Sequence, residues 1–255
     1  MKILCIGDIV GRCGRDAVFS YLDKNRQNYD LVIANAENAA HGKGLSKPVY
    51  EELISAGIDG ITLGNHTWGC PDIVNVLKYN DNVIRPANFD KSCPGMGSMI
   101  LKTQSGVDVG VINLIGRVYM QPADSPFTMV DEIIENIKRK TDIIVVDFHA
   151  EATSEKIAMG YYLDGKVSCV FGTHTHVQTA DEKILKNGTG YITDLGMCGP
   201  IHSVLGINKN AVVGKFLDNM PVKFEVANGE AMFSACVFEI DNETGKTISI
   251  ERVQK

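Results

Sequence analysis

Side chains able to bind metal ions or move protons lie just beyond short apolar runs along much of the chain. These side chains are Asp8, Glu37, Asn38, Asn65, His66, His149, His174 and His176. Oxygen and imidazole donors without a thiolate suit manganese, iron or zinc and do not choose among them. The residue types therefore predict a metal cluster, and such clusters can activate water and bind phosphoryl oxygens for ester hydrolysis.

His174 and His176 are the most informative pair because a single residue separates them. Alternate residues of an extended segment project to the same side, so both imidazoles can reach one cluster. Each polar residue has an ordinary explanation when taken alone, since an Asp after a strand often caps a helix and a lone His is usually structural. Their recurrence at successive strand ends favours a shared site.

The apolar runs predict the strands that must hold these residues, at residues 3–6, 31–34, 60–63, 107–113, 143–147 and 167–171. Segments with helical spacing lie between several of the runs, at residues 15–25, 48–56, 71–78 and 129–140. This alternation predicts an α/β fold in which helices flank a sheet. In such folds ligands bind beyond the carboxyl ends of the strands, which is where the polar residues lie.

From about residue 188 the pattern changes to short β-type runs separated by Asn-Gly and Glu-Thr-Gly turns. The runs at residues 191–193, 212–213, 222–226 and 235–240 predict antiparallel strands and hairpins. The chain has no visible repeat or linker, and 255 residues are enough for one sizeable core. We therefore expect a single domain spanning residues 1–255.

Composition argues against several classes of protein. The formal net charge of −6 lacks the basic field expected of an extended nucleic-acid surface. No run approaches the ~18 apolar residues of a membrane span, so no membrane partner is expected. The seven cysteines form no Cys-x-x-Cys pair, which argues against a disulfide framework and a thiolate zinc site. With no charged leader after Met1, the sequence predicts a cytoplasmic protein.

At these residues the chain resembles the calcineurin-like metallophosphoesterase superfamily and, more closely, the YmdB-like family of bacterial metallophosphoesterases. The matching motifs are Gly7-Asp8-Ile9-Val10-Gly11, Ala36-Glu37-Asn38, Gly64-Asn65-His66-Thr67-Trp68, residues 147–156 and residues 172–179. The resemblance implies a four-layered α/β/β/α sandwich of mixed sheets. It also implies a phosphodiesterase that acts on 2′,3′-cyclic nucleotides and a homo-oligomer, either a dimer or a tetramer.

By the same resemblance the candidate residues divide between two metal ions and a proton donor. One ion would be held by Asp8, Asn38 and His176, the other by Asn65, His149 and His174, and both by a bridging Glu37. The ions would be iron or manganese, with zinc as the alternative. A metal-bound hydroxide would attack phosphorus, and His66 would protonate the ribose oxygen that leaves.

The sequence departs from the wider superfamily near these residues. Val10 stands where a histidine is common, and the bridging residue is Glu37 instead of Asp. Asn38 takes the place of the missing histidine, as in the closer family. Thr67 follows His66 where an acidic residue is usual, so the sequence does not identify the carboxylate that orients His66.

Other functions and other residues stay open at this point. A regulatory protein would use the same cluster to sense a nucleotide with slow or no turnover, and a related hydrolase would cleave phosphomonoesters or protein phosphates. His41 and His202 are second-tier candidates for the border of the substrate site. Glu151 and Glu155 either orient metal ligands or stabilise the start of a helix.

Overall fold

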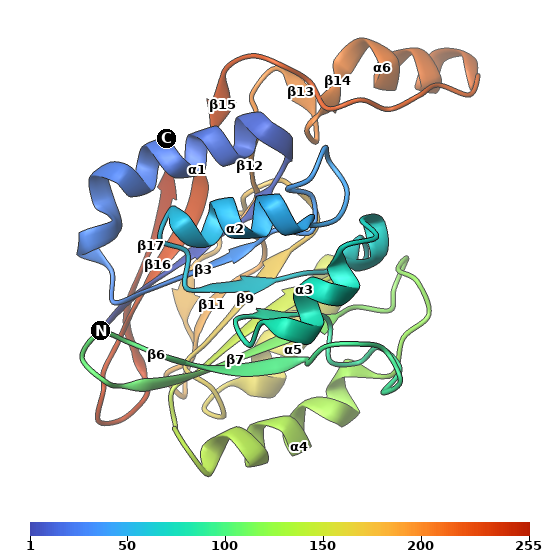
Figure 1. Ribbon diagram of the computed structural model, residues 1–255. Helices are drawn as coiled ribbons and strands as arrows, with labels where there is room; N and C mark the ends of the chain where they lie inside the picture. Colours follow the sequence, from blue (N-terminus) through green and yellow to red (C-terminus); the bar gives the residue numbers. More distant parts are fainter.

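The computed structural model describes residues 1–255 and contains two six-stranded sheets packed face to face (Figure 1). The first sheet has the order β17 (Thr247–Gln254), β16 (Ser234–Ile240), β1 (Lys2–Ile6), β3 (Leu31–Asn35), β4 (Gly60–Thr62) and β5 (Val83–Ile84). The second has the order β10 (Lys183–Ile184), β11 (Gly190–Ile192), β9 (Cys169–Thr173), β8 (Ile144–His149), β7 (Asp108–Ile115) and β6 (Ser98–Lys102). Each sheet joins parallel to antiparallel pairs and is therefore mixed.

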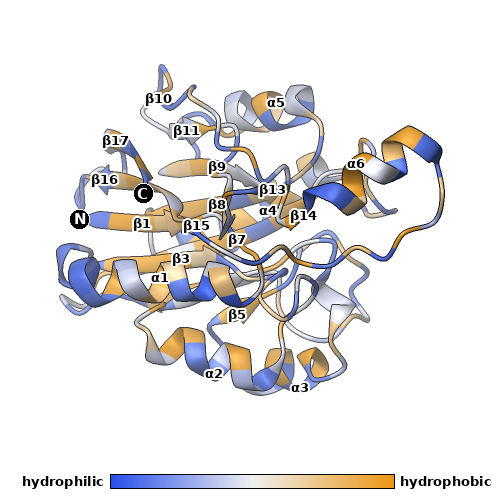
Figure 2. Cartoon of the chain, turned by 90° about the horizontal axis from the view of Figure 1, so that it is seen from above, coloured by the Kyte–Doolittle hydropathy of each residue, from blue (hydrophilic) through white to orange (hydrophobic).

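Helices cover the outer face of each sheet (Figure 2). The first sheet packs against α1 (Gly11–Asn25), α2 (Lys47–Ser55) and α3 (Ile73–Tyr79). The second packs against α4 (Pro126–Lys138) and α5 (Thr153–Leu163). The predicted four-layered α/β/β/α sandwich of mixed sheets is thus confirmed. None of the helices combines the length and apolar character needed to span a bilayer.

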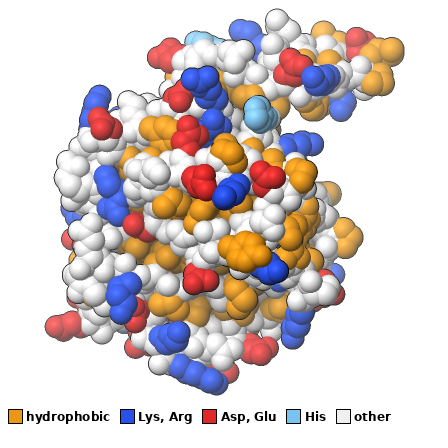
Figure 3. All heavy atoms as spheres, in the orientation of Figure 1, with side chains coloured by type: hydrophobic (Ala, Val, Ile, Leu, Met, Phe, Trp, Pro, Cys, Tyr) orange, Lys and Arg blue, Asp and Glu red, His pale blue; other side chains and the backbone are white.

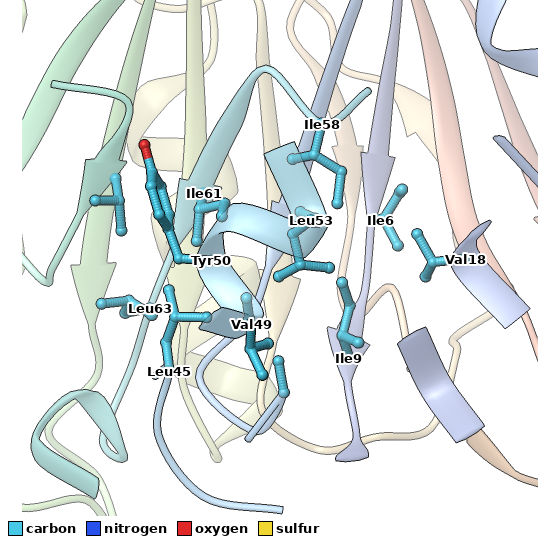
Figure 4. Close-up of a cluster of buried hydrophobic side chains, with 14 of the residues drawn as sticks. Ile6, Ile9, Val18, Leu45, Val49, Tyr50, Leu53, Ile58, Ile61 and Leu63 are labelled. Atoms are coloured by element: carbon cyan, nitrogen blue, oxygen red, sulfur yellow. The ribbon is translucent and has the colours of Figure 1, made fainter. Parts of the chain in front are cut away.

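Three buried hydrophobic clusters fill the three interfaces between these four layers. In β1, Ile3 and Cys5 belong to the cluster between the sheets, whereas Leu4 and Ile6 belong to the cluster under the first set of helices. Successive side chains of a strand point to opposite faces, so burial on both faces requires a continuous apolar run. Figure 4 shows Ile6 facing the helical layer beside Val18.

Residues 200–227 project from the body of the molecule and are called the arm below (Figures 1 and 3). The arm contains β13 (Ser203–Val204), β14 (Ile207–Asn208) and α6 (Lys209–Asp218). It follows β12 (Met197–Pro200), which pairs with β2 (Asp8–Ile9) and β15 (Ala231–Met232). The arm is therefore anchored beside β2, the short strand that begins at Asp8.

The strands predicted at residues 212–213 and 222–226 are wrong, whereas those at 191–193 and 235–240 are confirmed as β11 and β16. Residues 212–213 lie in α6, and only Val226 of the other run pairs, as an isolated bridge to Ile207. The Asn208 side chain accepts hydrogen bonds from the backbone N–H groups of Asn210 and Ala211 and so caps the helix. This N-cap outweighs the weak strand preference of two adjacent valines.

Candidate metal centre

The predicted site residues meet where strands of both sheets end. Asp8 follows β1, Glu37 and Asn38 follow β3, and Asn65 follows β4, while His149 ends β8 and His174 and His176 follow β9. Parallel strands deliver their carboxyl ends to one edge of a sheet, and two facing sheets bring two such edges together. Residues distant in the sequence thus share one site.

His149 lies at the centre of the tightest group of side chains. Its Nε2 atom is 2.8 Å from Asn65 Oδ1, 3.1 Å from Glu37 Oε1 and 3.1 Å from His174 Nδ1. One ligand atom each from Glu37, His149 and His174 lies within 4.8 Å of the other two. Four potential donor atoms for a metal ion therefore lie close together.

Asp8 and His176 form a neighbouring pair, and Asn38 lines the adjacent cleft together with His176. Asp8 Oδ1 lies 4.0 Å from His176 Nε2, and its other oxygen accepts a hydrogen bond from the backbone N–H of His174 at 3.0 Å. Asn38 Nδ2 donates to the carbonyl of Gly42 at 3.0 Å, which fixes the orientation of the amide. Asp8 Oδ1 and Asn38 Oδ1 are both buried without a hydrogen-bond partner. Buried acceptors left unpaired cost free energy, so these two oxygens fit a cation.

Each of the three histidines has a partner for the ring nitrogen that faces away from the cluster. His174 Nε2 lies 3.2 Å from Glu151 Oε2, and His176 Nδ1 lies 3.0 Å from the carbonyl of Leu205. His149 Nδ1 lies 2.9 Å from Thr173 Oγ1. Histidines that bind metals almost always donate their other ring N–H in this way, which leaves the inward nitrogen free as an acceptor. The three inward nitrogens are thus suited to binding a metal.

Asp147 determines the tautomer of His149 through Thr173. The Asp147 carboxylate is fully buried and accepts hydrogen bonds from Thr173 Oγ1 at 2.7 Å, Thr62 Oγ1 at 2.5 Å and Asn35 Nδ2 at 3.1 Å. Since the Thr173 hydroxyl uses its only hydrogen on Asp147, it accepts from His149 Nδ1–H. Burial raises the pKa of Asp147 to about 7, and the three hydrogen bonds oppose that rise.

Replacing Thr173 with valine is expected to weaken metal binding by the ~10–100-fold typical of removing the hydrogen-bond partner of a metal ligand. Valine has nearly the same shape but offers no acceptor to His149 Nδ1–H, so either tautomer becomes available. Isothermal titration with Mn²⁺ measures the affinity. Thr173→Ser keeps the hydroxyl and is expected to bind as the parent does, and equal affinities for the two variants would contradict this role.

Burial shifts the pKa values of the cluster in opposite directions. It lowers the pKa of His149 to about 4 and that of His174 to about 3, so both imidazoles are neutral at pH 7. It raises the pKa values of Asp8 and Glu37 because no charge nearby compensates fully for their lost hydration. Neutral imidazoles beside carboxylates that lack a positive partner are the electrostatic pattern expected of a metal site.

Asn65 and His66 lie in a turn from Gly64 to Thr67, and their side chains point in different directions. The Thr67 N–H and hydroxyl both donate to the carbonyl of Gly64, at 3.1 Å and 2.6 Å. A Cβ atom at Gly64 would lie 2.3 Å from His149 Nε2, so only glycine fits there. The turn directs Asn65 toward His149 and leaves His66 lining a cleft beside the cluster.

His66 is bound to the cluster through its backbone and not through its ring. Its backbone N–H donates to Glu37 Oε2 at 2.6 Å, and burial lowers the pKa of its imidazole despite the nearby Glu37 charge. Glu37 therefore holds the loop of His66, and the structure shows no carboxylate that is hydrogen-bonded to the His66 imidazole.

Lys156 and Asp194 support the loop that carries His174 and His176, a role that the sequence did not suggest. Lys156 Nζ donates to Asp194 Oδ2 at 2.5 Å and to the carbonyl of Thr173 at 2.7 Å. Asp194 also accepts from the N–H groups of Thr175 at 3.2 Å and Gly196 at 2.8 Å. The sequence feature that could have identified Asp194 is its position just after β11, since the other site residues also follow strands.

Lys156→Met is expected to lower the free energy of unfolding by ~3–5 kcal/mol because it leaves the Asp194 carboxylate buried without its cation. Both side chains of this pair are only 1% exposed. Urea denaturation measures the change. Lys166→Met is the matched control, since Lys166 pairs with Asp131 at side-chain exposures of 39% and 45%, and such pairs contribute ~0–1 kcal/mol. Similar losses in the two variants would contradict the prediction.

The second-tier candidate residues have different surroundings in the structure. His41 lines the cleft, whereas His202 is exposed outside it. Glu151 contacts His174, but Glu155 accepts from the backbone N–H groups of Arg117 and Val118 at 2.9 Å and 3.3 Å. Glu151 is therefore placed to orient a ligand, and Glu155 holds a neighbouring loop.

Comparison with known proteins gives the family of the chain. The family model described as YmdB-like protein matches residues 4–253. The chain belongs to the YmdB-like family. The resemblance inferred from the motifs is thus confirmed.

Relatives of this YmdB-like chain include a curated 2′,3′-cyclic-nucleotide 2′-phosphodiesterase of Bacillus subtilis (strain 168). The two sequences are 48% identical over 255 residues, which is 99% of this chain and 96% of the relative. A hypothetical protein from Thermus thermophilus has a similar structure, with a TM-score of 0.95, 40% identity and coverage of 100% and 99% of the two chains. A structure described as a novel phosphatase from Mycoplasma pneumoniae has a TM-score of 0.93, 40% identity and coverage of 100% and 93%.

Proposed function

We propose that this YmdB-like chain is a metal-dependent phosphodiesterase that hydrolyses 2′,3′-cyclic nucleotides. The observation that carries the proposal is a group of carboxylate, amide and imidazole atoms that lie close together and act as hydrogen-bond acceptors. Two further buried oxygens, of Asp8 and Asn38, have no hydrogen-bond partner. The substrate class follows the relative from Bacillus subtilis, with which this chain shares nearly its whole length.

Two metal ions fit this set of donors. We propose that Asp8, Asn38 and His176 hold one, that Asn65, His149 and His174 hold the other, and that Glu37 bridges them. Donors without a thiolate suit manganese, iron and zinc alike, and we propose iron or manganese, with zinc as the alternative, because of the family resemblance. When bound, such ions neutralise phosphoryl oxygens and lower the pKa of water.

The side chains of the chain supply the remaining chemistry. Asn65 and His66 are consecutive residues of one turn, so one faces the cluster and the other faces the cleft where a substrate would lie. A ribose oxygen leaves phosphorus poorly unless it gains a proton as the bond breaks. His66 is the ionisable group on the cleft wall that we assign to this transfer, and Glu37 fixes its backbone.

A substrate panel tests the proposed activity. Protein loaded in turn with manganese, iron and zinc is assayed on 2′,3′-cyclic nucleotides, 3′,5′-cyclic nucleotides, a phosphomonoester and a phosphopeptide. The expected result is fastest turnover of the 2′,3′-cyclic nucleotides. Binding of a nucleotide without turnover would instead identify a regulatory sensor, and preference for the monoester or phosphopeptide would identify a phosphatase.

We also propose a cytoplasmic location and a homo-oligomer, either a dimer or a tetramer. All seven cysteines are free, which suits a reducing compartment. The outer face of α6 exposes Phe216 at 82% and Leu217 at 80%, and large exposed apolar residues favour contact with another subunit. Light scattering on the purified protein measures the mass, and a monomer at all concentrations would contradict the oligomer.

A further inference from the structure

A cleft of about 790 Å³ opens beside the proposed metal centre and has two walls of different character. The wall on the body of the molecule includes Asn38, His66 and His176 from the site, with His41 and Lys43 at its border. The wall on the arm consists of apolar side chains, from Leu205, Ile207, Phe224 and Val226. The volume lies within the ~300–1,000 Å³ usual for pockets that bind small molecules.

The arm wall is held together by contacts within the arm and touches the body at two places. Within the arm, Val226 pairs with Ile207 as a bridge, and the carbonyl of Gly206 accepts from the N–H of Ala227 at 2.9 Å. A Cβ atom at Gly42 would lie 2.6 Å from Val226 Cγ2, so this side chain fills the space above the loop that follows Asn38. The same arm supplies the Leu205 carbonyl that orients His176. The arm therefore contacts the body of the molecule at Gly42 and His176.

Phe224 is the aromatic residue of the arm wall. Its side chain lines the cleft while remaining 46% exposed, and Lys215 Nζ lies 4.8 Å from the centre of its ring. An ammonium group over an aromatic ring is attractive and restricts how the ring turns. The cleft thus has a planar apolar surface in addition to the residues that would face the phosphate.

We propose that Phe224 and the apolar arm wall form the subsite that binds the base of the nucleotide. The inference rests on the proposed function, because that function places the phosphate beside Asn38, His66 and His176. A base stacks on an aromatic ring through its face, and every base has such a face. The apolar side chains of the arm wall offer a base no hydrogen bond, so recognition by this wall depends on stacking.

The test compares substrates with and without a base. In Phe224→Ala, KM for 2′,3′-cyclic AMP is expected to rise by ~5–150-fold, the range for loss of one stacked base. The kinetic constants for methyl riboside 2′,3′-cyclic phosphate, which carries no base, are expected to remain those of the parent. Phe224→Tyr keeps the ring and is expected to restore KM for the nucleotide.

Tyr161→Ala is the control, because it removes an exposed aromatic ring of α5 that lies outside the cleft lining. An unchanged KM for 2′,3′-cyclic AMP in Phe224→Ala, or an equal loss on both substrates, would overturn the base subsite while leaving the phosphodiesterase intact. A parent protein that hydrolyses neither cyclic phosphate would remove both proposals. Metal content measured for each variant separates these results from damage to the cluster.

Discussion

His66→Ala is expected to lower kcat on 2′,3′-cyclic nucleotides by ~10²–10⁴-fold while the protein keeps its metal ions. The imidazole lines the cleft, and only its backbone N–H is bound to Glu37. Truncation of the side chain therefore leaves the ligands in place and removes the proposed proton donor. Steady-state kinetics and elemental analysis of the same preparation measure both effects.

A substrate with a better leaving group tests more directly whether His66 donates a proton. A 4-nitrophenyl phosphodiester expels an anion that needs little protonation, so the loss in His66→Ala should be much smaller on this substrate. His202→Ala, which removes an exposed histidine outside the cleft lining, serves as the control and should behave as the parent does. Equal losses on both substrates would assign His66 to loop structure and not to proton transfer.

Glu37→Gln is expected to reduce the metal bound per chain and to weaken metal affinity by more than the ~10–100-fold typical of changes to groups that only orient the ligands. Glu37 Oε1 lies 3.1 Å from His149 Nε2, and its other oxygen accepts from the His66 N–H at 2.6 Å. The amide preserves the shape and this hydrogen bond but removes one negative charge from between the two proposed ions. Activity should fall with the metal content.

Glu135→Gln is the matched control, because it removes the same charge from an exposed position of α4. It should retain the metal content of the parent by elemental analysis. Unchanged metal stoichiometry in Glu37→Gln would show that this carboxylate does not bridge two ions. Restored activity at high metal concentration would instead separate weakened binding from loss of a catalytic group.

The hydrophobic pattern of the sequence predicted much of the fold. The continuous apolar run before Asp8 predicts a strand buried on both faces, and the structure places its side chains alternately in two hydrophobic clusters. The strand predicted at Val212 and Val213 was wrong, because Asn208 caps the start of a helix that includes both valines. A short segment without a core to pack against follows its capping residue, and a valine pair cannot override it.

The sequence by itself determined which residue types end each strand, and hence the predicted donors for a metal site. Only the tertiary structure decided which atoms of those residues face one another. Asn35 and Asp147 are separated by 112 positions, and their hydrogen bond depends on how the two sheets pack. The tautomer of His149, the ion pair under the histidine loop and the apolar wall of the arm likewise arise between distant segments. Periodicity within one segment carries no information about such contacts, because the relative placement of the layers comes from packing across the whole core.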